Sequence, residues 1–273
     1  MRTRRCLVIG CAALLLLGIV GGGIAARTLD QILSSGEVRV GFYPQDPPKQ
    51  YYDPDTGEPI GLEVDIAGEF AASLGVDLKL IDSEWDALIP GLLSDKWDII
   101  IANMARLTSR AVSVSFTLAY ENIDGMVALI RSDETRFEAI ADLNQDGVRI
   151  GVNRGSAGHS CAETLAPLAE IQPFQSAQLA AMALQAGQLD AVVEDLTTME
   201  LYAAEHDNVR VIGAECPSCP VYTGFAIQHG NFDLWLFANQ FLFNLKKSGT
   251  YQELYAKWFP DRPDPGTDVW GDN

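Results

Sequence analysis

Short apolar runs alternate with amphipathic segments from Glu37 almost to the end of the chain. The runs are rich in β-branched residues and lie between polar, glycine or proline positions, which is typical of β-strands. They predict strands at Val38–Phe42, Val76–Ile81, Asp98–Ala102, Gly125–Ile130, Val148–Val152, Asp190–Val193, Val209–Ile212 and Gly224–Gln228.

The segments between these runs carry apolar side chains at helical spacing. They predict helices at Leu62–Leu74, Trp85–Leu93, Ala162–Ala169, Ser176–Ala186 and Leu196–Glu205, and Gly75 is a stop signal for the first of them. Strands that alternate with helices indicate an α/β fold with mainly parallel sheets and right-handed crossovers. The stretch from Asp53 to Pro59 contains Pro54 and Gly57 and predicts a surface hairpin turn.

A weak internal repeat suggests two related halves. LIPGLLSDKWDIIIA (Leu88–Ala102) and MALQAGQLDAVVED (Met182–Asp195) both run from a helix through a short turn and an aspartate into a β-branched strand. Two similar lobes would each own one such unit. A single doubly wound sheet would also repeat strand–helix–strand units, so both arrangements remain open at this point.

The first 26 residues have the layout of a secretory signal peptide. Arg2, Arg4 and Arg5 precede an apolar run from Cys6 to Ala26 that contains no acidic residue and ends in small side chains. The run is also long enough to span a bilayer, so an uncleaved membrane anchor is the alternative. Either way, we expect the body of the protein to work outside the cytoplasmic membrane, in the periplasm or the extracellular space.

The net charge of −18 disfavours nucleic acids and anionic lipids as partners, because so acidic a surface repels both. In an oxidising compartment, the spacing of Cys216 and Cys219 predicts a local disulfide and leaves Cys161 unpaired. The alternative joins His159 and Cys161 to that pair as a zinc site. We expect the disulfide, and neither a metal nor a cofactor.

The segment LTSRAVSVSFTLAY, from Leu107 to Tyr120, holds the first candidate for ligand binding. Thr108 or Ser109 could cap a short helix and place Arg110 in its first turns. A planar guanidinium near a helix N-terminus is suited to holding a carboxylate through two parallel hydrogen bonds. An ordinary ion pair with a neighbouring acid is the alternative for Arg110.

An ordered series of motifs resembles one family. RVGF, GLEVDIAGEFAASLG, WDALIPGLLSDKWDIIIANM, LTSR, GVNRGSAG, LQAGQLDAVVED and YQELYAKWF follow one another between Thr28 and Phe259. This series resembles the extracellular solute-binding proteins of family 3, the polar-amino-acid receptors of ABC transporters. The resemblance implies an α/β fold of the periplasmic-binding-protein type II, with two lobes, a hinge and a ligand cleft between them.

The same resemblance implies a division of the chain. Residues 1–26 would be the signal peptide, residues 27–124 and 222–260 the first lobe, and residues 125–221 the second. Residues 261–273, rich in proline, aspartate and glycine, would form a flexible tail.

By resemblance, Arg110 binds the α-carboxylate of the ligand and Asp195 its α-ammonium group. Trp85 covers the ligand side chain, while Gly155 and Ser156 supply donors from the second lobe. Pairing both charges makes physical sense, because a zwitterion that loses water needs a partner for each.

Tyr43 and Asn103 complete the predicted ligand-binding set. Tyr43 follows a strand whose end faces the cleft in the family. The chain has Ala105, Leu107 and Ala157 where the family usually has hydroxyl residues, so Asn103 would replace part of the missing hydrogen bonding. Lys49 stands where an aromatic residue is usual. These departures leave room for a ligand other than a standard α-amino acid.

The predicted function is an exported receptor that captures an amino acid or a related small organic acid for ABC import. We expect a monomer that delivers its ligand to a transporter permease, binds no nucleic acid and catalyses no reaction. One alternative is a periplasmic lyase of the cyclohexadienyl dehydratase type, for which Glu194 and His159 are the candidate acids. Another is a membrane-anchored sensor or accessory binding protein.

Overall fold

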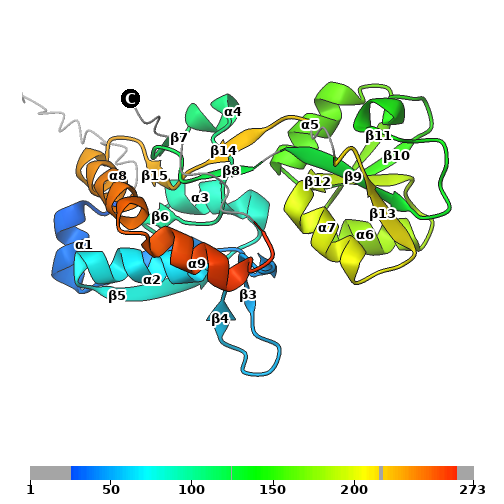
Figure 1. The fold of residues 1–273 in the computed structure, drawn as a ribbon. Helices are drawn as coiled ribbons and strands as arrows, with labels where there is room; N and C mark the ends of the chain where they lie inside the picture. The colour runs from blue at the N-terminus through cyan, green and yellow to red at the C-terminus, as the bar shows by residue number, and fades with distance from the viewer. Residues whose placement is uncertain (1–25, 124, 215–217, 263–273) are drawn as a thin grey trace, which may run out of the picture.

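The computed structural model describes residues 26–123, 125–214 and 218–262, which form two α/β units side by side (Figure 1). The predicted signal peptide and most of the predicted tail lie outside these residues. In the described part of the chain, no helix is both long and apolar enough to cross a membrane.

Each unit is built around a five-stranded sheet. The strand order of the first sheet is β5 (Asp77–Asp82), β1 (Glu37–Phe42), β6 (Ile99–Ile100), β15 (Ala226–Gln228) and β7 (Val114–Phe116). That of the second is β11 (Glu170–Phe174), β10 (Arg149–Asn153), β12 (Ala191–Asp195), β9 (Met126–Arg131) and β13 (Val209–Ile212). Each predicted strand segment overlaps one of these strands, whereas β7 and β11 were not predicted.

The two sheets share one pattern of strand directions. The first three strands of each order are parallel, whereas the fourth, β15 or β9, is antiparallel to the third. Both fourth strands follow directly after the chain has crossed from the other unit, without a helical crossover to reverse their direction. The predicted parallel arrangement therefore holds for the first three strands of each order, and the crossings explain why the fourth strands differ.

The chain crosses between the units twice. β8 (Glu121–Ile123) leaves the first unit, β14 (Val221–Thr223) returns to it, and the two pair in antiparallel fashion (Figure 1). The repeat found in the sequence falls on both sides of these crossings. Its first copy forms α3 (Leu88–Leu93) and β6, and its second forms α6 (Ala177–Gln185) and β12.

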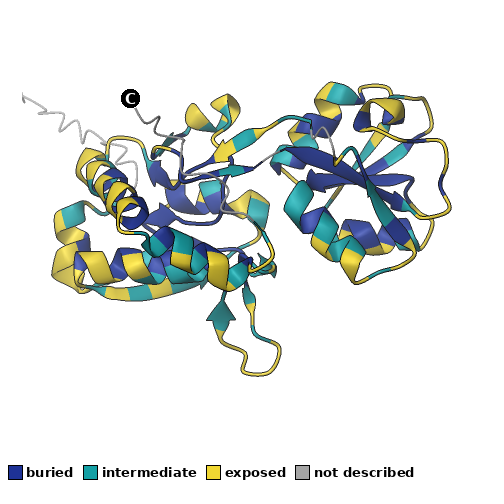
Figure 2. Ribbon diagram, in the orientation of Figure 1, coloured by how far each residue is buried: buried dark blue, intermediate teal, exposed yellow. Residues whose placement is uncertain are grey.

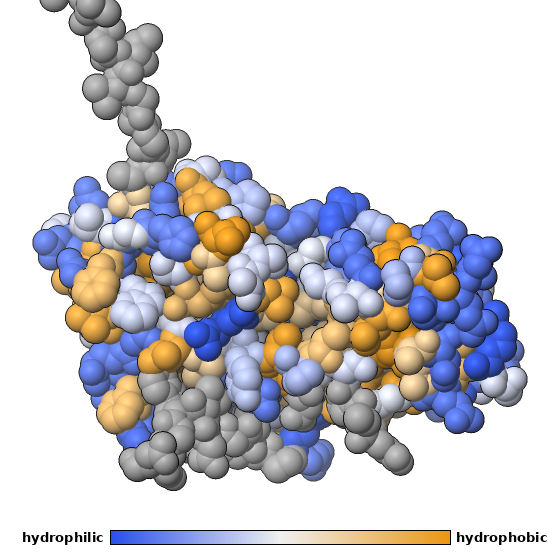
Figure 3. Space-filling view, turned by 90° about the horizontal axis from the view of Figure 1, so that it is seen from above, coloured by the Kyte–Doolittle hydropathy of each residue, from blue (hydrophilic) through white to orange (hydrophobic). Residues whose placement is uncertain are grey.

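Helices cover both faces of each sheet and bury the strands between them (Figure 2). In the first unit, α1 (Leu29–Ser35), α2 (Leu62–Leu74), α8 (Phe232–Lys247) and α9 (Thr250–Trp258) share one apolar core, while α3 and the 3-10 turn η1 (Trp85–Ala87) pack against the other face. In the second unit, α5 (Ala157–Leu165) and η2 (Ile140–Leu143) lie on one face, and α6 and α7 (Leu196–Ala204) on the other. Seen from above, hydrophobic side chains reach the surface in small groups among hydrophilic ones (Figure 3).

Smaller elements complete the first unit. α4 (Thr108–Ala111) is a single turn, and β2 (Gln45–Asp46), β3 (Gln50–Tyr52) and β4 (Pro59–Ile60) form a small antiparallel sheet. The turn predicted between Asp53 and Pro59 joins β3 to β4. α2 has the predicted bounds and ends at Gly75, whose φ of 71° favours glycine.

α5 differs from its prediction. It begins at Ala157 rather than Ala162, because the Ser156 hydroxyl accepts the backbone N–H of His159 and caps the helix. The cap lies beside a glycine-rich turn that the apolar pattern alone did not include in the helix. The N-terminus of α5 therefore reaches the end of β10.

The predicted Cys216–Cys219 disulfide is wrong for this structure. Cys219 is bonded instead to Cys161, 58 positions earlier, with 6.1 Å between the Cα atoms. Cys161 is buried on α5, and Cys219 packs against the same apolar core of the second unit. Cys216 lies outside the described residues. Sequence spacing favoured the short loop, whereas the fold brings the distant cysteine alongside. The bond also uses two of the four ligands of the alternative zinc site.

We expect the Cys161–Cys219 bond to stabilise the protein. Replacing both residues by alanine should lower the free energy of unfolding by about 2–4 kcal/mol, because the bond closes a long loop and restricts the unfolded chain. Denaturant unfolding without reductant measures this, and Cys216→Ser is the matched control, which should unfold like the wild type. A loss of similar size in Cys216→Ser would restore the local pairing, because the double variant removes Cys219 and would break either bond.

Candidate functional site

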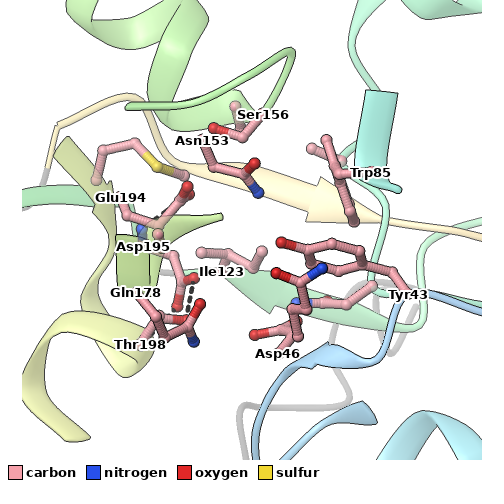
Figure 4. A pocket seen from close by; sticks show the side chains of 16 residues that line it. Tyr43, Asp46, Trp85, Ile123, Asn153, Ser156, Gln178, Glu194, Asp195 and Thr198 are labelled. Atoms are coloured by element: carbon pink, nitrogen blue, oxygen red, sulfur yellow. Dashed lines mark hydrogen bonds between the residues drawn. The ribbon is translucent and has the colours of Figure 1, made fainter. Parts of the chain in front are cut away.

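A pocket lies where the carboxyl ends of the parallel strands of both units meet. In open α/β sheets, this edge is where ligands bind. Tyr43 follows β1 and Trp85 follows β5 on one side, while β10 and β12 end at Asn153 and Asp195 on the other (Figure 4). Asn103, which follows β6, also lines the pocket. The lining residues are Tyr43, Gln45, Asp46, Trp85, Asn103, Ala105, Ile123, Met126, Asn153, Ser156, Ala157, Ala177, Gln178, Glu194, Asp195 and Thr198.

Five of the seven predicted ligand-binding residues line this pocket: Tyr43, Trp85, Asn103, Ser156 and Asp195. The other two, Arg110 and Gly155, contact one another beside it: Arg110 Nη2 donates to the Gly155 carbonyl at 2.7 Å. Sequence elements from both units thus meet at one place.

Arg110 is half-buried between the units. Its Nη1 donates to the Ala105 carbonyl at 2.8 Å, and its guanidinium lies 5.6 Å from the centre of the Trp85 ring. Trp85 Nε1 also donates to the Gly155 carbonyl, at 3.3 Å. Burial lowers the pKa of Arg110 to about 10, while the negative charge of Glu194 acts in the opposite direction and raises it. The guanidinium therefore stays a cation at neutral pH.

The turn between β10 and α5 has the backbone geometry that Gly155 allows, with a φ of 71°. The Gly155 N–H donates to Nδ1 of His159 at 3.1 Å. At Gly158, a Cβ atom would lie 2.5 Å from the Val193 carbonyl oxygen, so α5 packs closely on β12. These contacts aim the N-terminus of α5 at the pocket.

Asp195 ends β12 and caps α7. Its carboxylate accepts the Thr198 N–H at 3.0 Å and the Thr198 hydroxyl at 2.6 Å. Nζ of Lys49, from the first unit, lies 3.8 Å from Asp195 Oδ1. The carboxylate therefore lines the pocket while partners on both units hold it in position.

Lys49 is 2% exposed. The Asn103 amide, oriented with its oxygen toward Lys49, accepts from Nζ at 2.5 Å and donates to the Thr223 hydroxyl at 3.2 Å. Burial disfavours the ammonium, but the carboxylates of Asp195, Asp46, Glu121 and Glu63 outweigh it and raise the pKa of Lys49. The departure at position 49 thus places a buried cation beneath the pocket.

The sequence interpretation missed several lining residues, notably Asp46, Asn153 and Gln178, and named Glu194 only as a candidate acid of a lyase. Glu194 is 7% exposed, and burial and the charge of Asp195 raise its pKa to about 8. The available sequence signal was the pair of consecutive acids that ends the apolar strand in LDAVVED. A carboxyl group at the end of a buried strand is costly unless it has a partner or a function, so both acids were candidates for the site.

His159, the other candidate acid, lies outside the lining set and at the N-terminal turn of α5. Its Nδ1 receives the Gly155 N–H, and its Nε2 lies 3.5 Å from Glu163. In this structure His159 supports the Gly155 turn.

The family model described as bacterial extracellular solute-binding proteins, family 3, matches residues 38–261. The chain belongs to this family.

Named relatives of this family 3 protein are amino-acid-binding proteins. The L-arginine-binding protein of Pseudomonas aeruginosa is 29% identical over 95% of this chain and 99% of its own length. The L-cystine-binding protein TcyJ of Escherichia coli K12 is 27% identical over 85% of each chain.

Solved structures show the periplasmic-binding-protein type II fold for this family 3 protein. The P235GK mutant of ArgBP from T. maritima superposes with a TM-score of 0.79 at 33% identity, covering 85% of this chain and 99% of the other. The ancestral amino acid-binding protein AncCDT-1, described as a precursor of cyclohexadienyl dehydratase, gives 0.77 at 31% identity, covering 85% and 98%.

Proposed function

We propose that this protein captures an amino acid between its two units and delivers it unchanged to an ABC transporter. The observation that carries the proposal is the placement of Arg110 and Asp195 on different units at one pocket. A zwitterion brings one negative and one positive group, and each would find its opposite charge across the cleft. The named relatives, which are arginine- and cystine-binding proteins, support the same ligand class.

In this proposal the two units are lobes that close on the ligand. Residues 27–124 and 222–260 form the first lobe and residues 125–221 the second. Two crossing strands, β8 and β14, would restrict their relative motion to a hinge. The contacts of Arg110 and Trp85 with Gly155 already join the lobes at one side of the pocket. A ligand that binds both lobes would stabilise this arrangement.

A role in transport also implies where the protein works and which protein it meets. The family is extracellular, so we propose that residues 1–26 direct export and that the mature chain meets a membrane permease as a monomer. Arg262, the second residue of the predicted tail, donates to the Thr197 hydroxyl at 3.0 Å and pairs with Glu200 of α7, so the start of the tail contacts the second lobe.

The lyase alternative makes Glu194 a proton donor. Its raised pKa suits that chemistry, and one solved neighbour is described as a precursor of a dehydratase. Recovery of the ligand distinguishes the two functions, because a receptor releases the compound it bound and a lyase releases a smaller product. Mass spectrometry of ligand released after incubation with the protein makes this comparison.

A thermal-shift screen over amino acids and small organic acids tests the proposed function. Ligand at about one hundred times its Kd adds roughly 2.7 kcal/mol of stability. For a chain of this size, that raises the midpoint by roughly 5–10 °C. In the same samples, X-ray scattering should show a smaller radius of gyration, because the lobes close. Absence of a shift with every amino acid would contradict the proposal.

A further inference from the structure

Two deeply buried side chains of the second lobe present oxygen atoms to the pocket without hydrogen-bond donors. They are Glu194 and Asn153, which are 7% and 6% exposed. The Glu194 carboxyl group has the Ser156 side chain beside it and accepts the Asp195 N–H at Oε1, at 3.2 Å, but no hydrogen bond from the described residues satisfies Glu194 Oε2, Asn153 Oδ1 or Oε1 of Gln178. Figure 4 shows the Asn153 amide pointing into the pocket. A buried acceptor that lacks a donor costs free energy, so a ligand that brings N–H groups to these atoms would be favoured.

The charges of the lining point to the same ligand chemistry. Asp46, Glu194 and Asp195 line the pocket, and none of the described lining residues is a lysine, arginine or histidine. Lys49, from beneath the pocket, offsets part of this charge through its pair with Asp195. An ordinary zwitterion brings a single cation, and that cation would be used at Asp195. Glu194 would then remain a buried carboxyl group without a cation.

Aromatic side chains form the opposite wall. Tyr43 and Trp85 meet edge to face with 5.5 Å between ring centres, on the side of the pocket opposite Glu194 (Figure 4). Aromatic rings favour a cation nearby and also pack against the methylene groups of a long side chain. A flat or compact cationic group could therefore lie between this wall and the acceptors of the second lobe.

We propose that Glu194 and Asn153 form a subsite for a second cationic nitrogen group, so that the ligand is a basic amino acid with an ammonium or guanidinium side chain. This inference rests on the proposed function, which places the α-carboxylate at Arg110 and the α-ammonium at Asp195. Burial and the charge of Asp195 raise the pKa of Glu194 to about 8, and a cation beside the carboxyl group lowers that pKa again. Glu194 therefore ionises as the ligand binds and supplies the opposite charge, and Asn153 and Gln178 supply carbonyl acceptors for the remaining N–H groups. Glu194 is then a specificity-determining residue that the resemblance to the family did not indicate.

Calorimetry with L-arginine and L-citrulline tests the subsite. The two probes have similar shapes, but citrulline carries a neutral urea group in place of the guanidinium. The wild type should bind arginine at least about 10-fold more tightly than citrulline, and Glu194→Gln should weaken arginine binding about 10- to 100-fold. Citrulline binding should change less than about threefold in that variant and so show that the site is intact.

The matched control is Glu138→Gln. Glu138 is an exposed acid of the second lobe that does not line the pocket, so removing its charge should leave both affinities unchanged. Equal loss of arginine and citrulline binding in Glu194→Gln would overturn the subsite, as would a wild type that prefers citrulline. If Arg110→Ala abolishes arginine binding while Glu194→Gln binds it normally, the proposed function stands and the subsite falls. If the wild type binds no amino acid, the proposed function itself fails.

Discussion

Arg110→Ala and Asp195→Ala should each weaken ligand binding by hundreds-fold or more, on the order of 3–5 kcal/mol. Either change leaves one charge of the zwitterion buried without its partner. The Ala105 carbonyl holds Arg110 from within its own unit, and Thr198 holds Asp195 from within the other, so each charge keeps its position in its lobe as the lobes close. Calorimetry with the ligand found by the thermal-shift screen measures both losses.

Conservative variants separate charge from geometry. Arg110→Lys keeps the charge but loses the two parallel donors, so binding should still weaken clearly. Asp195→Asn can still cap α7, because asparagine is also a good N-cap residue. It should weaken amino acids but spare a plain organic acid, which has no ammonium group. This comparison settles the ligand class left open by Ala105, Leu107 and Ala157.

Arg106→Ala is the control, since Arg106 is an exposed arginine four positions before Arg110 that does not line the pocket. The affinity of this variant for the ligand should stay within about threefold of that of the wild type. If Arg110→Ala and Asp195→Ala also bind within threefold, the two residues are structural charges and the proposed site is wrong.

Lys49→Met should lower the free energy of unfolding by about 3–5 kcal/mol at pH 8. Methionine keeps the length of the side chain but removes the cation that faces Asp195 and Asp46. Because the pKa of Lys49 is raised in the folded state, its stabilisation is fully present at neutral pH and is lost only above its unfolded pKa. Denaturant unfolding measures the difference.

The loss of unfolding free energy in Lys49→Met should become smaller as the pH falls from 8 to 5. Burial already raises the pKa of Asp46 to about 6 and that of Glu63 to about 8, and losing Lys49 removes a charge that opposes both shifts. In the variant, the buried and ionised carboxylates of Asp46 and Glu63 lower the free energy of unfolding, so their protonation at lower pH restores part of the lost stability. Lys79→Met, which removes an exposed lysine 3.7 Å from Glu37, should cost less than about 0.5 kcal/mol. An equal deficit at both pH values would indicate a packing role for Lys49.

Local pattern was enough for much of the fold. The bounds of α2 follow from its helical periodicity and from Gly75, and the strand segments follow from short β-branched runs, because both signals act between neighbours in the chain. The ordered motifs also placed Arg110, Trp85 and Gly155 at one site, and the structure brings these three into contact. Such residues lie at the ends of predictable strands and helices, which fixes where they lie relative to the sheets.

Only the tertiary structure decided which distant side chains are partners. Cys219 pairs with Cys161 rather than with its near neighbour because α5 and the returning chain pack in one core. Lys49 meets Asp195 because the first unit faces the second across the pocket. The unpartnered oxygen of Glu194 depends on which donors the folded chain leaves out of reach. Local pattern determines the elements and the ends from which side chains project, whereas pairing and solvation depend on contacts between elements far apart in the sequence.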